Sequence, residues 1–78
     1  MSQVSTLSSC VRGTKVVVDK INVSPLIVLR LSEMGIFPES EITVVDNQKT
    51  GPLIIRSKRS NIALHRKIAE NTFIISVN

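Results

Sequence analysis

The sequence predicts a mostly β domain with one short helix (α+β), in which a strongly bent antiparallel sheet closes into a small barrel. Short apolar runs, either alternating or rich in β-branched residues, recur along the chain and are typical of strands. Turn-forming residues separate these runs at short intervals. One segment carries both a start signal and a stop signal for a helix. Because about five strands are expected, closure into a barrel is the economical way to avoid exposed sheet edges.

The first strand is predicted over Thr14–Ile21 because this stretch is rich in valine. Val16 and Val18 point to the same face of the strand. Ile21 has the opposite parity, so a bulge near Asp19-Lys20 is needed to return its side chain to the core.

A short helix is predicted after this strand, between Ser24 and Pro38. Ser24 is a suitable N-cap, and Pro25 suits the first helical position, where a missing N–H costs nothing. Gly35 stands where helices take a left-handed closing residue, and Pro38 prevents the helix from continuing.

Two faces of this helix are apolar. The spacing of Ile27, Leu31 and Met34 places them together on the expected core face. Leu26 and Leu29 point roughly the opposite way. Two interpretations remain open: the helix is wedged between two surfaces, or these leucines are offered to something outside the chain.

The remaining elements are short. Further strands are predicted at Glu41–Asp46, Leu53–Lys58, Ile62–Leu64 and Phe73–Val77. Asn47–Pro52 is a turn between the first two of these strands, and His65–Asn71 can form one helical turn before the last. Alternation directs inward the side chains of Ile42, Val44, Leu53 and Ile55.

The 78 residues are enough for one small domain, spanning 1–78. Cys10 is the only cysteine, and one unpaired thiol favours a reducing, cytoplasmic setting. Met1–Ser9 lacks the basic and apolar regions of a signal peptide. No apolar run approaches the ~20 residues that a membrane span needs. A cytoplasmic protein is therefore expected.

The chain is basic, with a net charge of +4 and a pI near 9.9. This permits contact with nucleic acid, anionic lipid or an acidic protein surface. Positive charge concentrates at Arg56, Lys58, Arg59, His65, Arg66 and Lys67, and a solvated surface is the simplest interpretation. Phe37 and Phe73 are the only aromatic residues, whereas single-strand binders normally stack bases on aromatic side chains. A protein-interaction module is therefore favoured over a nucleic-acid-binding one.

No catalytic or metal-binding pattern is evident. His65 is the only histidine, and it can pair with Cys10 only if the fold brings the two together. The carboxylates show no paired spacing, and a metal site usually takes three or four protein ligands. The glycines are isolated, unlike those of a phosphate-binding loop. We therefore expect no enzyme, no metal site and no cofactor.

Four segments carry a resemblance to a known family. Leu29–Pro38 (LRLSEMGIFP) is similar to the pattern RL-x-E-L/M-G-I/L-x-P-G. Gly51–Ile55 is similar to G-(D)-P-I-x-I, Ile62–Ala69 to I-A-L-R-x-x-x-A, and Gly13–Ile21 to G-x-x-x-x-V-x-x-I. In order and spacing over most of the chain, these segments resemble the FeoA family, which comprises small cytosolic proteins of bacterial ferrous iron uptake systems.

The resemblance implies an SH3-like β-barrel with the helix inserted after the first strand. It also implies an accessory or regulatory role, exerted by protein–protein interaction with the cytosolic GTP-binding domain of the FeoB membrane transporter. The chain would then meet the membrane only through the transporter. Nucleic acid is not expected as a partner, and self-association is left open. The alternative function is a basic SH3-like module that binds nucleic acid or binds proteins in general.

Four positions depart from the family pattern. Glu39 stands where the family usually has glycine, which indicates a different turn or strain at a positive φ. Arg59 replaces a second common glycine in the hairpin before Ile62. Ser57 and Thr72 occupy positions that are usually apolar.

The candidate partner-binding residues form two groups. The first group is the outer face of the helix, and the second is a basic hairpin whose charge would attract an acidic partner. The residues are Leu26, Leu29, Arg30 and Glu33 in the first group, and Arg56, Lys58 and Arg59 in the second.

Overall fold

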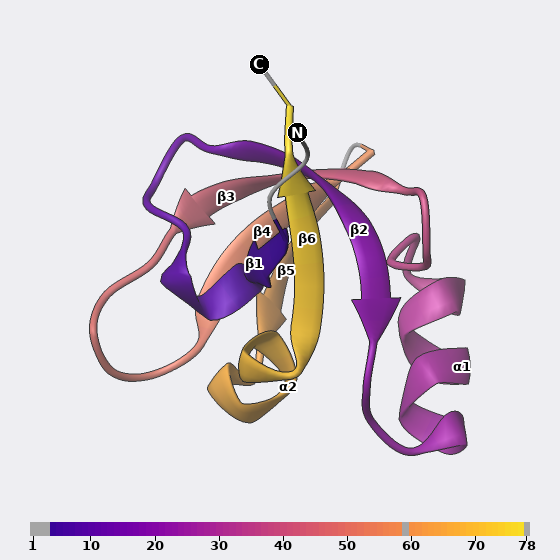
Figure 1. Cartoon of the computed structure of the whole chain (residues 1–78). Coiled ribbons are helices and arrows are strands. Elements are labelled where there is room, and N and C mark those ends of the chain that lie inside the picture. The colour runs from indigo at the N-terminus through magenta and orange to yellow at the C-terminus, as the bar shows by residue number, and fades with distance from the viewer. Residues whose placement is uncertain (1–3, 59, 78) are drawn as a thin grey trace.

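The computed structural model describes residues 4–58 and 60–77. Within them the chain forms a six-stranded sheet of order β1-β6-β2-β3-β4-β5, and every pairing is antiparallel. The elements are β1 (Val4–Thr6), the 3-10 turn η1 (Leu7–Ser9), β2 (Lys15–Ile21), α1 (Pro25–Glu33), β3 (Glu41–Asp46), β4 (Leu53–Ser57), β5 (Ser60–Leu64), α2 (Arg66–Glu70) and β6 (Thr72–Ser76). Figure 1 shows the sheet curling on itself and α1 standing outside it, on the side of β2. The predicted fold class, a mostly β chain with a short helix, is confirmed. The helix follows the first predicted strand, which is the second strand of the structure because β1 precedes it.

Strand β1 is not predicted by the sequence. Val4–Thr6 has three residues and lies in a polar stretch without apolar alternation. Its partner is β6, where Ser5 lies opposite Ile74, close to the other end of the chain. A pairing between segments so far apart in the sequence leaves no local pattern from which it could be predicted. The sheet therefore has six strands instead of about five.

The bulge expected in the first long strand is present in β2. The pairing of β2 with β6 shifts register between Val18 and Lys20. As a result Ile21 packs, partly buried, against the core. A second shift, which the sequence does not predict, lies between Val44 and Asp46 in the pairing of β3 with β4. Bulges increase local twist, so both help the sheet to curl.

The core fills the inside of the curled sheet. The predicted inward residues Ile42, Val44, Leu53 and Ile55 are each at most 1% exposed. The other buried apolar residues are Leu7, Cys10, Val16, Val18, Leu31, Ile36, Leu64, Ala69 and Ile74. Strand β4 ends one residue before its predicted end, because Lys58 has a φ of 56° and begins the turn. Arg59, which the sequence places in the hairpin before Ile62, lies outside the described residues. Strand β5 begins at Ser60, two residues before its predicted start.

The predicted helix and its caps are confirmed. Ser24 Oγ accepts a hydrogen bond from the N–H of Ile27 at 3.4 Å, and Pro25 occupies the first helical position. Gly35 follows the helix with a φ of 92°, the conformation that glycine adopts most readily. A side chain at this position would force Ser57 to move, because an added Cβ would lie 2.5 Å from Ser57 Oγ.

One of the three residues predicted to form the core face of α1, Met34, does not lie in the core. Leu31 is buried and Ile27 packs partly buried against the core, but Met34 is 44% exposed. The helix ends at Glu33, so helical spacing no longer directs the side chain that follows it. Ile36, whose N–H donates to the carbonyl of Leu31 at 2.8 Å, is buried instead.

The two hydroxyl residues at usually apolar positions, Ser57 and Thr72, are buried and hydrogen-bonded. Ser57 Oγ donates to the carbonyl of Gly35 at 2.9 Å, and Thr72 Oγ1 donates to the carbonyl of Ile68 at 2.7 Å. A hydrogen bond offsets most of the cost of burying a hydroxyl group. The Ser57 bond also joins the C-terminal end of α1 to the end of β4.

The helical turn predicted within His65–Asn71 is α2, which has five residues. His65 caps it, because its Nδ1 accepts a hydrogen bond from the N–H of Lys67 at 3.2 Å. Helix α1 has nine residues. In the part of the chain that the structure describes, no helix is long and apolar enough to cross a membrane.

Candidate protein-interaction surfaces

The outer face of α1 is open to solvent. Leu26 and Leu29 are 60% and 56% exposed, and Arg30 and Glu33 beside them are exposed as well. The helix attaches to the domain by its opposite face, where Leu31 is buried. The interpretation that the helix is wedged between two surfaces is therefore wrong, since nothing within residues 4–58 and 60–77 covers the two leucines.

The basic hairpin begins at the end of β4. Arg56 is exposed there, and it lies opposite Thr43 of β3 and Asn61 of β5. Its Nε donates to Asn61 Oδ1 at 3.1 Å, which orients the guanidinium along the sheet surface. Lys58 is also exposed, at the start of the turn. Arg59, the third member of this group, lies outside the described residues.

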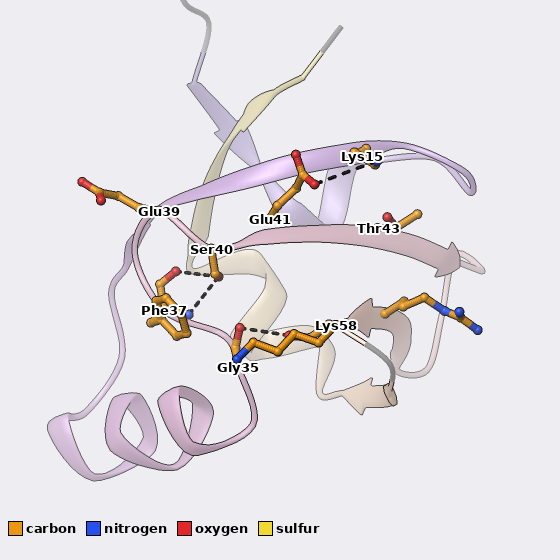
Figure 2. A pocket seen from close by; sticks show the side chains of 10 residues that line it. Lys15, Gly35, Phe37, Glu39, Ser40, Glu41, Thr43 and Lys58 are labelled. Carbon is orange, nitrogen blue, oxygen red and sulfur yellow. Dashed lines mark hydrogen bonds and ion pairs between the residues drawn. The ribbon is translucent and has the colours of Figure 1, made fainter.

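The two candidate groups lie on adjoining elements. The hydrogen bond from Ser57 to the carbonyl of Gly35 joins the end of α1 to the hairpin. In Figure 2 the side chain of Lys58 extends toward Gly35. The hairpin therefore lies next to the C-terminal end of α1, whereas Leu26 belongs to the first turn of that helix.

A groove of about 510 Å³ opens at this junction, over the outer face of β2, β3 and β4 (Figure 2). Its lining includes Lys15, Phe37, Glu39, Thr43, Arg56 and Lys58. Lys15, Thr43 and Arg56 are successive partners across the three strands and form a polar row. Among these residues the sequence singles out Arg56 and Lys58 by their charge and Glu39 by its departure from glycine. It does not predict the row, because a row across strands depends on register.

The loop between α1 and β3 forms one wall of the groove, and hydrogen bonds fix its conformation. Ser40 Oγ accepts a hydrogen bond from the N–H of Phe37 at 3.1 Å and donates to its carbonyl at 2.7 Å. The loop is also tied to β2, since Glu39 N donates to the carbonyl of Val18 at 2.7 Å. The groove is therefore formed before any partner arrives.

Backbone strain concentrates at the same place. Glu39 has a φ of 77° and Lys58 a φ of 56°, and no other described residue besides glycine has a positive φ. Both residues line the groove. The positive φ considered at Glu39 from its position in a glycine site is therefore confirmed, and Glu39 joins Arg56 and Lys58 as lining residues that the sequence analysis singled out.

Known proteins that are similar to this chain identify its family. A model of the FeoA domain matches residues 5–75. Over 57 residues the chain is 44% identical to an Fe(2+) transport protein A of Methanocaldococcus jannaschii, a match that covers 73% of this chain and 68% of that protein. The chain belongs to the FeoA family. Proteins of this family are small accessory factors of ferrous iron transport and are not known enzymes.

Solved FeoA structures have the same fold. The crystal structure of an iron uptake regulatory protein, FeoA, has a TM-score of 0.88 at 25% identity, with 96% of this chain and 100% of that chain covered. A zinc-bound FeoA from Stenotrophomonas maltophilia, a prokaryotic SH3 domain protein, has a TM-score of 0.74 at 24% identity, with 90% and 88% covered. The predicted SH3-like fold is thus confirmed.

In this FeoA-family chain, Cys10 and His65 are both engaged in local contacts. Cys10 Sγ lies 3.7 Å from the carbonyl of Thr6, and burial raises the pKa of the thiol. His65 uses Nδ1 to cap α2. Among the described residues, no three His, Cys, Asp or Glu side chains gather in a way that could hold a metal ion.

Arg66 belongs to the basic concentration of the sequence, but its role is structural. It donates to the carbonyl of Gly51 at 2.8 Å, to Asn47 Oδ1 at 2.9 Å and to the carbonyl of Gln48. Asn47 in turn donates to the carbonyl of Cys10 at 2.6 Å. The interpretation of this basic concentration as a solvated surface does not hold for Arg66, which ties α2 to the loop between β3 and β4.

Proposed function

We propose that this FeoA-family chain is a cytoplasmic accessory or regulatory protein of a bacterial ferrous iron uptake system. It acts by binding the cytosolic GTP-binding domain of the FeoB membrane transporter, and it meets the membrane only through that transporter. Family membership supports the role in iron transport. The observation that carries the docking proposal is the exposed pair Leu26 and Leu29 on the outer face of α1.

The two leucines have the character of a docking site. Residues three apart are neighbours on a helix surface, so Leu26 and Leu29 form one continuous apolar spot. Single exposed leucines are ordinary. Here Arg30 and Glu33 are exposed beside an adjacent pair, as in an interface with an apolar centre and a polar rim. Covering both leucines would contribute on the order of 2–3 kcal/mol to binding.

The basic hairpin is proposed to assist this docking. Arg56 and Lys58 are exposed, and Arg59 follows them in the sequence. Charges at the rim of an interface mainly change the association rate and its salt dependence. They are complementary to an acidic region of the partner. This group is therefore expected to speed the encounter without dominating the final affinity.

The double variant Leu26→Gln/Leu29→Gln tests the proposal. Because both side chains face solvent, we expect an unchanged fold and an unchanged sedimentation profile. Binding to the purified FeoB GTP-binding domain should fall at least ~10-fold, in line with the lost apolar contact. Uptake of labelled ferrous iron should fall with it in cells that carry only the variant.

Val11→Gln is the matched control, because Val11 is exposed and apolar but lies on the loop before β2. This variant should bind and transport normally. Unchanged uptake with the double variant would refute the docking surface. A melting temperature lower by several degrees, or a shift of the protein from dimer to monomer, would assign the leucines to internal packing or to self-association instead.

A further inference from the structure

We propose that the groove over β2, β3 and β4 binds an extended peptide segment that carries carboxylate side chains next to an apolar side chain. No residue of α1 is among the described residues that line this groove. The groove is therefore a second surface beside the outer face of α1, and it shares Arg56 and Lys58 with the basic hairpin that is proposed to assist docking. Peptide binding in the groove holds whether or not the transporter is the partner of that face.

The charges of the groove leave two cations available. Lys15 and Glu41 form an exposed ion pair at 3.9 Å, the only one within the described residues, so Lys15 already has a carboxylate neighbour. The carboxylate of Glu39 extends away from the other labelled side chains in Figure 2. Arg56 and Lys58 thus have no carboxylate partner among the residues that the structure describes. Carboxylates of a bound segment would fill this role.

The guanidinium of Arg56 is already oriented for such a contact. Its Nε is engaged by Asn61 Oδ1 at 3.1 Å, which leaves the terminal N–H groups as donors. Hydrogen bonds from guanidinium groups to carboxylates are roughly twice as strong as neutral ones. Thr43, the neighbour of Arg56 on β3, adds a hydroxyl group to the same row. The row across the strands thus offers a line of polar contacts to an extended chain.

Phe37 supplies the apolar part of the site. Phe37 is 37% exposed and lines the groove together with these polar groups. Both backbone polar groups of Phe37 are held by Ser40 Oγ. A wall that is ordered in advance reduces the entropy lost on binding. An apolar side chain of the segment can therefore pack on this ring at little ordering cost.

A peptide suits this site better than a nucleic acid. A phosphate backbone carries a negative charge at every step, whereas Arg56 and Lys58 are the two lining cations without a carboxylate partner among the described residues. Nucleic-acid strands also need several aromatic platforms, whereas the groove has Phe37 alone. A peptide places its few carboxylates at separate positions. It can therefore match two carboxylates to Arg56 and Lys58.

The test is a titration of the ¹⁵N-labelled full chain, followed by amide chemical shifts. The probe is an acetylated hexapeptide of alternating Asp and Leu, compared with a Lys–Leu and an Asp–Ser hexapeptide of the same length. We expect saturable shifts at Gly35, Phe37 and Lys58 with the Asp–Leu peptide, and a Kd on the order of 10⁻⁴ M at low salt. Neither comparison peptide should shift these amides to the same extent, and added salt should weaken binding several-fold.

The charge-reversal variant Arg56→Glu/Lys58→Glu should bind the Asp–Leu peptide at least ~10-fold more weakly. Arg12→Glu/Lys67→Glu is the matched control, because both residues are exposed, neither lines the groove, and the net charge changes equally. The proposal is overturned by an equal response to the Lys–Leu peptide, by equal weakening in the control, or by no shift in the groove. Stronger shifts of the same amides by an oligonucleotide would overturn it in favour of nucleic-acid binding.

Discussion

Gly35 meets two steric demands at once. Its φ of 92° lies in the region where side chains are strained, and its missing Cβ makes room for Ser57 Oγ. The same Ser57 hydroxyl donates to the Gly35 carbonyl. The end of α1 and the end of β4 are therefore joined at a point where glycine is strongly favoured. Gly13 shares the first demand, with a φ of 91°, but nothing lies within 4 Å of its Cβ position.

Gly35→Ala should therefore destabilise the domain more than Gly13→Ala. We expect a loss of about 1–2 kcal/mol at Gly13 from backbone strain alone. At Gly35 the contact with Ser57 should add at least ~1 kcal/mol, as in an overpacked core. Urea unfolding of both variants measures the difference. The variant Gly35→Ala/Ser57→Ala should recover part of the added loss, and equal losses at the two glycines would contradict the steric argument.

At the scale of elements, the loop between β3 and β4 depends on α2. Arg66 donates to Gly51, Asn47 and Gln48 of this loop, and Asn47 continues the network to the carbonyl of Ser8 at 3.0 Å. The network joins segments that are far apart in the sequence. It leaves the loop with fixed partners although residues 48–51 are exposed.

Arg66→Ala should therefore loosen one element more than the whole fold. We expect a loss of about 1–3 kcal/mol of stability, because hydrogen bonds from a charged group are removed. Access of their acceptors to water limits this loss. Amide hydrogen exchange should accelerate first in the loop between β3 and β4. Lys67→Ala is the control, since this neighbouring side chain is exposed and makes no described hydrogen bond. Uniform acceleration over all strands would contradict a local role.

At the scale of the whole molecule, the net charge of +4 is not evidence for nucleic-acid binding. Two of the basic side chains already have partners within the domain. Arg66 donates hydrogen bonds to the loop between β3 and β4, and Lys15 pairs with Glu41. The exposed cations Arg56 and Lys58 lie beside only one exposed aromatic ring, that of Phe37. The electrostatic attraction that remains is general and easily screened.

Binding to a random single-stranded oligonucleotide should accordingly be weak at low salt and vanish near physiological salt. Fluorescence anisotropy over a salt series measures this. Each phosphate contact contributes about −0.7 to the logarithmic salt slope, so Arg56→Glu/Lys58→Glu should flatten the slope by about 1.4 or more. Sequence-selective binding that survives at physiological salt would favour the nucleic-acid alternative over a protein partner.

The sequence by itself determined the features that short local patterns encode. The two ends of the helix could be predicted from Ser24, Pro25 and Gly35, because capping depends on residues within one turn. Alternation placed Ile42 and Ile55 in the core, and broken parity placed the bulge before Ile21. The family resemblance, spread over segments in fixed order, pointed to the SH3-like fold and to a docking role.

Only the tertiary structure decided what depends on contacts between distant segments. Strand β1 exists because β6 pairs with it, and the groove exists because register aligns Lys15, Thr43 and Arg56 across three strands. Arg66 became a structural tie because the fold brings the β3–β4 loop to α2. Ile36 replaced Met34 in the core because the chain turns at Gly35, where helical spacing ends. Such contacts depend on the whole fold, so the local spacing of residues does not predict them.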